Sequence, residues 1–268
     1  MTTTTVTAPP ATAAALARPR PARDTWLVLV RELRPVVRDP FTVIFSLFQP
    51  LVFLGLFVPL LVVQTGQATA EVLTWFVPGV LVMIVLFGTG ATGSNLQYEI
   101  MFGSHERTLV APISRSALLV GRALKEVVPI VVQSLVIVAI ALPFGYRADP
   151  LGLALGIVLL AVFGVGLGSL SYTLALKTKS NEWVFWAVQQ SLIFPLLILS
   201  GVLLPLEGAP GWMRAVASVN PVSWVTEGER ALLQGELVSG TVGAAFLAAL
   251  VLAVLGLVVG IRAIRRSD

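Results

Sequence analysis

The side chains best able to do chemistry gather in one stretch of an otherwise apolar chain. Residues 105–126, HERTLVAPISRSALLVGRALKE, carry the only histidine of the sequence among several charged residues. A membrane hydrolase would pair a histidine with a nucleophile in a G-x-S-x-G elbow, and a metal site would need a cluster of histidines or cysteines. The chain has one histidine and no cysteine. We therefore interpret His105 as a solvated loop residue and expect no catalytic residue and no metal site.

Two further kinds of chemistry are missing from the sequence. ATP hydrolysis requires a phosphate-binding G-x-x-x-x-G-K-[ST] loop, and no Gly-Lys dipeptide occurs anywhere in the chain. Enzymes that act on prenyl or sugar diphosphates hold magnesium with clustered aspartates, whereas Asp24, Asp39 and Asp149 are scattered. The sequence therefore predicts a chain that is not itself an enzyme and binds no cofactor of its own.

The rest of the sequence has the composition of a membrane protein. Of its 268 residues, 56% are hydrophobic and only 12% are charged, whereas soluble domains carry about 25% charged residues. The mean hydropathy is +0.91. Six apolar stretches are long enough to span a bilayer, at approximately 43–63, 72–96, 127–146, 151–176, 183–206 and 241–261. We predict an all-α, polytopic membrane protein with six transmembrane helices.

Basic residues occupy the gaps between these stretches, which argues against nucleic acid as the partner despite a net charge of +4. All 18 Lys and Arg residues except Arg147, Arg214 and Arg230 lie before the first stretch, in the gaps 97–126 and 177–182, or after the last stretch. Because Lys and Arg accumulate on the cytoplasmic side, we expect a multi-pass protein of the plasma membrane with both termini in the cytoplasm. Residues 1–23, rich in Thr, Ala and Pro, are expected to form a disordered cytoplasmic tail.

None of the six stretches contains Asp, Glu, Lys, Arg or His. A carrier driven by a proton or sodium gradient usually keeps an ionisable residue at mid-membrane depth, although backbone carbonyls can also coordinate sodium. A gradient-driven drug carrier acting without an ATPase is therefore an alternative that the composition disfavours.

Two stretches have patterns typical of particular helix environments. Residues 24–40 place apolar side chains opposite a charged side, which predicts an amphipathic helix in the membrane surface, with Asp24 able to cap it. Within 151–176, two GxxxG pairs allow helix backbones to approach closely; their glycines are Gly152, Gly156, Gly164 and Gly168. That contact lies either within one subunit, which is the simpler interpretation, or at the seam of a dimer.

The polar gap 97–126 is longer than a mere connection requires, since helix connections usually take about 2–8 residues. It should therefore bind something. Pro112 can start a helix there and Ser114 can cap it. Leu118, Leu119 and Leu124 would share its apolar face, with Arg115, Arg122 and Lys125 on the polar side.

The segment ERTLVAPISRSALLVGRAL resembles a pattern of the permease family called type 2 ABC exporters: Glu-Arg, then Thr/Ala-Pro-x-Ser-Arg, then Leu-Leu-x-Gly-Lys/Arg. In that family the segment forms a cytoplasmic coupling helix that docks on a separate ATPase subunit. The family form is slightly longer before its proline. The residues that the resemblance assigns to coupling are Glu106, Arg107, Pro112, Ser114, Arg115, Leu119 and Arg122, with Gly121 also matching.

Residues 199–235 resemble the same family's segment after the fifth span. There a broken helix pair re-enters the membrane from outside, which implies an external re-entrant segment at 207–240 here. Glu207, Glu227, Glu229 and Glu236 disfavour its deep burial. The matching residues, which the resemblance assigns to an outer gate, are Gly201, Pro205, Trp212, Asn220, Pro221, Trp224 and Arg230, together with Ser200, Pro210 and Gly211.

The similarity extends over 24–264, as one type 2 ABC transporter transmembrane domain, and its overall form is similar to the daunorubicin/doxorubicin-resistance type of transmembrane subunit. It implies a homodimer of permeases with two ATPase subunits, which carry ATP and magnesium. The cargo would be a lipophilic or amphipathic compound, such as a drug, an antibiotic or a lipid. Spans two and five would line the substrate cavity with Phe87, Asn95, Phe185, Gln189, Gln190, Ser191 and Phe194.

Two other interpretations remain. Exporters of polysaccharides or lipid-linked glycans use the same ABC mechanism and share most of these motifs. A non-transporting membrane scaffold or immunity protein is also possible for an apolar chain of this size, although the coupling motif argues against it.

Overall fold

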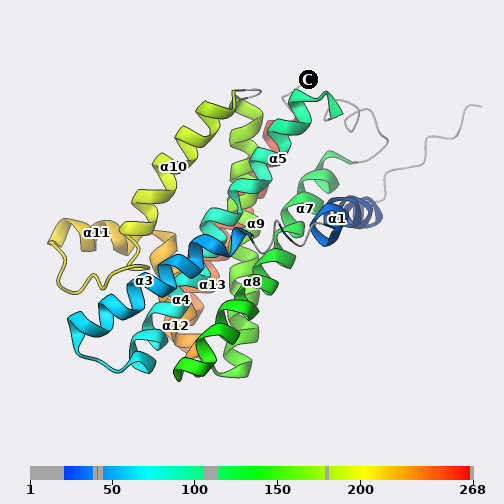
Figure 1. The fold of residues 1–268 in the computed structure, drawn as a ribbon. Coiled ribbons are helices and arrows are strands. Elements are labelled where there is room, and N and C mark those ends of the chain that lie inside the picture. The colour runs from blue at the N-terminus through cyan, green and yellow to red at the C-terminus, as the bar shows by residue number, and fades with distance from the viewer. Residues whose placement is uncertain (1–20, 39–40, 42–44, 105–113, 179–180, 266–268) are drawn as a thin grey trace, which may run out of the picture.

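The computed structural model describes residues 21–38, 41, 45–104, 114–178 and 181–265, and every element in these ranges is a helix (Figure 1). The predicted all-α class is therefore confirmed for the described residues. The helices are α1 (Pro21–Arg38), α3 (Phe48–Thr65), α4 (Thr69–Gly88), α5 (Gly90–Met101), α7 (Arg115–Lys125), α8 (Val127–Ala141), η1 (Leu142–Phe144), α9 (Pro150–Thr178), α10 (Glu182–Ile198), α11 (Gly211–Val219), α12 (Pro221–Leu233) and α13 (Gly240–Arg265).

Helix α4 forms the centre of the bundle. Its residues from Phe76 to Leu86 are buried without interruption, because α3, α8, α9 and α12 pack around it. A helix that is apolar on every side suits such a buried position. The preceding helix α3 ends at Thr65 because Gly66 adopts a left-handed conformation with φ +69° and donates its N–H to the carbonyl of Val62.

Five helical stretches are long and apolar enough to cross a membrane: Phe48–Thr65, Thr69–Met101, Ser116–Phe144, Pro150–Thr178 and Gly240–Arg265. They overlap five of the six predicted spans. The remaining predicted span, 183–206, contains α10, an apolar helix of only 17 residues. It stops at Ile198 because the chain turns at Leu199–Gly201, where Gly201 has φ +72°. The described helices thus support a multi-pass membrane protein with five candidate spans.

The polar gap predicted at 97–126 is helical at both ends. Helix α5 continues to Met101, and α7 runs almost directly into α8. Residues 105–113 lie outside the described residues, as do residues 1–20 of the predicted tail. Pro21–Arg23, also assigned to that tail, instead form the first turn of α1.

The glycines of α9 allow close packing within this chain, which agrees with the simpler interpretation of the GxxxG pairs. A Cβ added to Gly152 would lie 1.8 Å from the carbonyl oxygen of Leu232 in α12. Gly166 and Gly256 bring α9 and α13 together backbone to backbone, since a Cβ on Gly256 would lie 2.4 Å from the oxygen of Gly166. These close helix contacts therefore depend on glycine, which has no side chain to keep the backbones apart.

Helix α1 lies across the outside of the bundle and packs on α7 (Figure 1). The C-terminal part of α13 reaches the same end, because Gly260 contacts Leu119 of α7. Helix α12 and the 66–68 turn lie at the opposite end (Figure 1). Helix α7, the described part of the predicted coupling segment, and the predicted outer-gate segment thus lie at opposite ends of the molecule (Figure 1).

Candidate functional site

The predicted coupling helix begins with a hydrogen-bonded cap. The hydroxyl of Ser114 accepts a hydrogen bond from the N–H of Ala117 at 3.2 Å, which confirms the predicted cap. The N–H of Ser114 donates to Oδ2 of Asp24 at 3.4 Å. Asp24 was expected to cap the helix at 24–40, and that expectation is wrong: α1 starts earlier, at Pro21, and the buried Asp24 is bonded to the start of α7 instead.

Arg122 lies at the centre of a polar network between four helices. Its side chain is only 3% exposed. Its Nε donates to Oε1 of Glu32 in α1 at 3.3 Å, and one terminal nitrogen donates to the hydroxyl of Tyr172 in α9 at 3.2 Å. The other terminal nitrogen pairs with the carboxylate of Glu99 in α5. The guanidinium also lies over the ring of Tyr172, 5.5 Å from its centre.

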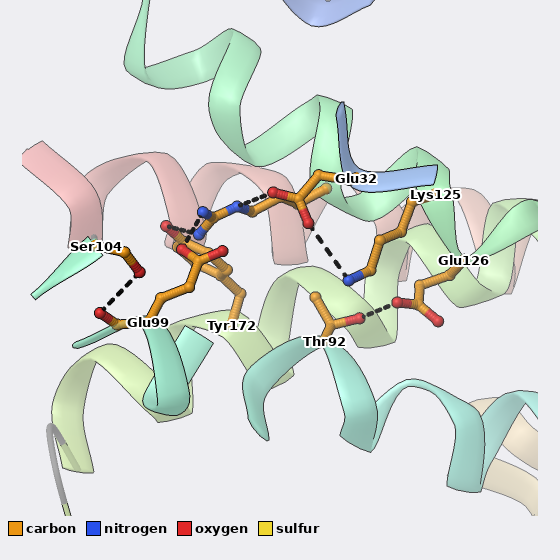
Figure 2. A network of polar contacts seen from close by, with 8 residues as sticks. Glu32, Thr92, Glu99, Ser104, Lys125, Glu126 and Tyr172 are labelled. Carbon is orange, nitrogen blue, oxygen red and sulfur yellow. Dashed lines mark hydrogen bonds and ion pairs between the residues drawn. The ribbon is translucent and has the colours of Figure 1, made fainter. Parts of the chain in front are cut away.

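Two residues at the C-terminal end of α7, Lys125 and Glu126, extend this network. Nζ of Lys125 lies 3.6 Å from Oε2 of Glu32. Glu126, which is also buried, accepts a hydrogen bond from the hydroxyl of Thr92 in α5 at 2.7 Å. Figure 2 shows these contacts side by side. Because buried charges are tolerated only when they are paired and hydrogen-bonded, the network fixes α7 to α1, α5 and α9.

The structure places the predicted coupling residues in three different situations. Glu106, Arg107 and Pro112 lie outside the described residues. Arg115 starts α7, but its side chain is likewise outside them. Leu119 is fully buried, against α13. Arg122 and Lys125 were expected on the polar side of the helix, and the structure buries this side in the network. Arg122 therefore holds α7 in place rather than presenting its charge to a partner.

Some of the predicted cavity residues pack against neighbouring side chains, and others are exposed. The rings of Phe87 and Phe194 meet edge to face, with centres 6.0 Å apart. Phe185 and Gln189 are buried against the glycines of α5, and Oε1 of Gln189 accepts a hydrogen bond from Ser171 at 3.2 Å. Asn95 and Ser191 are exposed and Gln190 is half-buried. Phe87 and Asn95 line a cavity of about 520 Å³ together with residues 45–46 and 48–50.

At the other end, Arg230 joins three separate segments. Its Nε donates to the carbonyl of Trp75 in α4 at 3.1 Å, and one terminal nitrogen donates to the carbonyl of Gly201 at 2.8 Å. The other terminal nitrogen bonds to Glu227 at 2.5 Å. The guanidinium lies 4.2 Å above the Trp75 ring. Burial lowers the pKa of Arg230, against the opposing effect of Glu227.

Other predicted outer-gate residues surround this joint. Asn220 caps α12 by accepting a hydrogen bond from Val222 N–H at 3.0 Å, and it also donates to the carbonyl of Leu196 in α10 at 3.0 Å. Pro221 is the first residue of α12. Trp212 is exposed on α11. Gly201, Pro205, Trp224 and Arg230 line an open cavity of about 1090 Å³.

The four glutamates that were expected to disfavour deep burial of the outer segment differ in their exposure within the protein. Glu229 is 0% exposed, whereas Glu207, Glu227 and Glu236 are exposed. Burial raises the pKa of Glu229 to about 8. The pattern was visible in the sequence, because Val222, Val225, Glu229 and Leu232 share one face of a helix. By contrast, the partners of Arg122 have no sequence signal, since Glu32 and Tyr172 are 90 and 50 residues away.

Comparisons with known proteins agree with this architecture. The sequence model of the family described as "ABC-2 type transporter" matches residues 23–233. The daunorubicin resistance ABC transporter permease protein DrrB1 of Streptomyces coeruleorubidus is 31% identical over 81% of this chain and 78% of its own length. A putative transport permease, ycf38, of Cyanophora paradoxa is 30% identical over 76% and 72%. The probable doxorubicin resistance ABC transporter permease protein DrrC of Mycobacterium tuberculosis (strain ATCC 25618 / H37Rv) is 27% identical over 79% and 77%.

The family model covers both ends of the bundle, from α1 with its paired Glu32 to the end of α12 with Arg230 and Glu229. Its match therefore includes every helix that contributes to the Arg122 network. The relatives are named as permeases, which are the membrane subunits of such transporters. This chain belongs to the ABC-2 type transporter family.

Proposed function

We propose that this chain is the membrane-spanning permease subunit of an ABC exporter. It pairs with a second copy of itself, and two separate ATPase subunits dock beneath the pair through residues 105–122. ATP and magnesium are held by the ATPase subunits, since this chain has no phosphate-binding loop. The complex exports a lipophilic or amphipathic compound across the plasma membrane.

One observation carries this proposal: the buried Arg122 fixes the predicted coupling helix to α1, α5 and α9 at once. A displacement of the start of α7 would therefore be transmitted to a spanning helix through the buried side chains that bond to Arg122. Glu99 ends the long stretch Thr69–Met101, and Tyr172 belongs to the stretch Pro150–Thr178. A merely structural loop between two spans would not need such a connection.

The same proposal assigns the sides of the membrane. The end with α1, α7 and the last residues of α13 faces the cytoplasm, so that both termini lie there. Helix α10 and residues 199–206 form a sixth span, and α11 and α12 form a re-entrant pair in the outer leaflet. The Asn220 and Arg230 contacts support this arrangement, because they tie α12 to the end of α10 and to α4.

The substrate class follows from apolar walls and from the relatives. Phe87 and Phe194 present aromatic surface from α4 and α10. Two relatives carry names that refer to daunorubicin and doxorubicin resistance. A lipophilic drug, antibiotic or lipid of comparable character suits such walls better than a polar solute.

Charge reversal in the docking segment tests the proposal. The permease and its ATPase are co-expressed, purified and reconstituted, and drug-stimulated ATP hydrolysis is measured for Glu106→Arg and for Arg107→Glu. We expect stimulation to be lost while the amount of permease in the membrane is unchanged. Arg147→Glu is the matched control, because Arg147 is exposed and lies beyond η1 at the opposite end of the bundle.

Two results would contradict the proposal. One is normal stimulation in both docking variants. The other is uphill drug movement by the permease alone in liposomes that contain no ATPase. The second result would identify a gradient-driven carrier, and a proton ionophore would then abolish the movement.

A further inference from the structure

The carboxyl group of Glu229 is a buried polar group that the export mechanism above does not use. It is 0% exposed, and neither of its oxygens has a hydrogen-bond partner among the described residues. It lies directly against the backbone of α9, since a Cβ added to Gly156 would be 2.4 Å from its Oε1. The face of α12 that carries it is otherwise apolar, with Val222, Val225 and Leu232 also buried.

One titratable neighbour of Glu229 is Tyr146, between η1 and α9. Its hydroxyl is also buried and also has no hydrogen-bond partner among the described residues. Burial raises the pKa of Tyr146, and the nearby Glu229 raises it further. The phenol is therefore neutral and supplies no positive charge that would stabilise a carboxylate.

The other charged groups on the surrounding elements do not compensate Glu229. Asp149 caps the start of α9 by accepting a hydrogen bond from Gly152 N–H at 2.7 Å. Glu71 of α4, Arg147 and Arg214 of α11 are exposed. Neither α13, from Gly240 to Ile261, nor α9, from Pro150 to Leu176, contains an Asp, Glu, Lys, Arg or His.

The neighbouring charged residues of α12 lie on a different face of this helix from Glu229. Glu227 and Arg230 bond to each other and line the outer cavity of about 1090 Å³, on the other face of α12. An ionised carboxylate in the position of Glu229 would thus be buried with no compensating charge and no donor. Because such burial is strongly unfavourable, the group takes up a proton instead.

We propose that Glu229 is a proton-binding site that controls the seating of α12 against α9. While the carboxyl holds its proton, α12 stays seated as described. When α12 moves away, the O–H bond of the carboxyl breaks, the proton passes to water in the outer cavity, and the resulting carboxylate is hydrated. Alkaline conditions therefore favour the unseated arrangement of the outer segment.

The direction of the pH effect follows from the two arrangements. A hydrated glutamate has a pKa near about 4.3, and burial raises the pKa of Glu229 to about 8 when α12 is seated. The seated arrangement binds more protons, so its advantage falls as the pH rises between these values and is constant above them. The equilibrium changes by up to about tenfold per pH unit in that window.

Cysteine labelling can detect this movement, since the chain contains no native cysteine. Thr226→Cys places a thiol on a residue of α12 that is 0% exposed. The rate of maleimide labelling of the purified full-length permease is measured from about pH 6 to about pH 9, with ordinary glutamate titration lying well below this range. The rate is divided by that of Val238→Cys, because Val238 is 99% exposed and corrects for the intrinsic reactivity of the thiol.

We expect the normalised labelling rate of Thr226→Cys to rise with pH when Glu229 is present. In the double variant Thr226→Cys, Glu229→Gln, the amide is uncharged at every pH, and the rate should not change. Equal pH dependence with and without Glu229→Gln would overturn the proposal, and so would a flat rate in both. If the double variant fails to fold, infrared spectra of the unlabelled wild-type protein decide instead: the C=O band of a protonated carboxyl must disappear between about pH 6 and about pH 9.

Discussion

The two ends of the bundle each bury an arginine, but they compensate its charge differently. Arg122 is paired with two carboxylates and a phenol from α1, α5 and α9. Arg230 has one carboxylate, and its other contacts are two backbone carbonyls and the ring of Trp75. Beside it, Glu229 has neither a hydrogen-bond donor nor an ion-pair partner among the described residues.

This difference suggests different mechanical roles for the two ends. Both arginines donate charge-assisted hydrogen bonds, but Arg122 meets two carboxylates, so its charge is neutralised and the inner network behaves as a fixed joint. The outer end has one carboxylate and two neutral carbonyl acceptors, beside a carboxyl group whose preferred position depends on its proton. If α7 is displaced, we therefore expect the contacts of α12 to break before those of the Arg122 network.

The largest effect is expected from removing the inner arginine. Arg122→Leu leaves Glu99 without its ion-pair partner and Glu32 with Lys125 alone, and breaking a buried ion pair in this way costs about 3–5 kcal/mol. Thermal unfolding of the purified permease in detergent measures the loss. The exposed Arg265 provides the control, because Arg265→Leu should leave the unfolding temperature nearly unchanged. Similar stability of both variants would show that the network is not a joint.

The outer arginine tests the weaker side of the comparison. In Arg230→Lys the positive charge remains, but an ammonium cannot reach the carbonyls of Trp75 and Gly201 and the carboxylate of Glu227 together. Loss of hydrogen bonds to a charged group costs about 1.5–3 kcal/mol in unfolding free energy. Arg214→Lys, on the exposed face of α11, is the matched control. If Arg230→Lys destabilised the protein as much as Arg122→Leu, the two ends would be equivalent.

A third prediction concerns the contact between α9 and Glu229. Gly156→Ala forces a methyl group against the carboxyl, and such overpacking costs about 1–3 kcal/mol. Gly168→Ala is the control, because its nearest contact would be 3.5 Å away. The combination Gly156→Ala, Glu229→Ala removes the clash, so its unfolding free energy should exceed the value that the two single variants predict by addition. If the effects of the two single variants on the unfolding free energy simply add, the added methyl group does not collide with the carboxyl group of Glu229.

The smallest effect is expected at the first turn of α7. Ser114→Ala removes the cap on the Ala117 N–H and costs about 1 kcal/mol of stability. Ser218→Ala is a suitable comparison, since its hydroxyl is exposed and only donates to a carbonyl within its own helix. Hydrogen exchange at the start of α7 should increase in Ser114→Ala alone. Equal exchange in both variants would argue that Asp24 alone holds this turn.

Features that depend on residues close together in the sequence could be predicted from the sequence. The cap at Ser114 depends on residues three apart, and the close approach of α9 depends on its own glycines, so both were accessible from the sequence. The class of protein followed from long apolar stretches. The length of α10 was overestimated, because the hydropathy of 199–206 remains high after the helix has ended at Ile198.

Long-range pairing could not be predicted in the same way. The sequence placed Arg122 on the polar side of α7, but nothing near it in the chain indicates that this side is buried; its partners come from α1, α5 and α9. The glutamates of 207–240 were taken to disfavour deep burial of that segment, although the position of Glu229 on its helix matches buried valines and leucines. In that case periodicity was the better guide than residue type.

The glycine contact between α9 and α13 limits which parts of the molecule can move. A side chain at Gly166 or Gly256 would collide with the backbone of the facing helix. In the export cycle that we propose, α9 and α13 should therefore stay together as one unit. Helices α3 and α10 instead expose large apolar side chains, such as Leu56, Leu60 and Leu192, at the surface of the bundle.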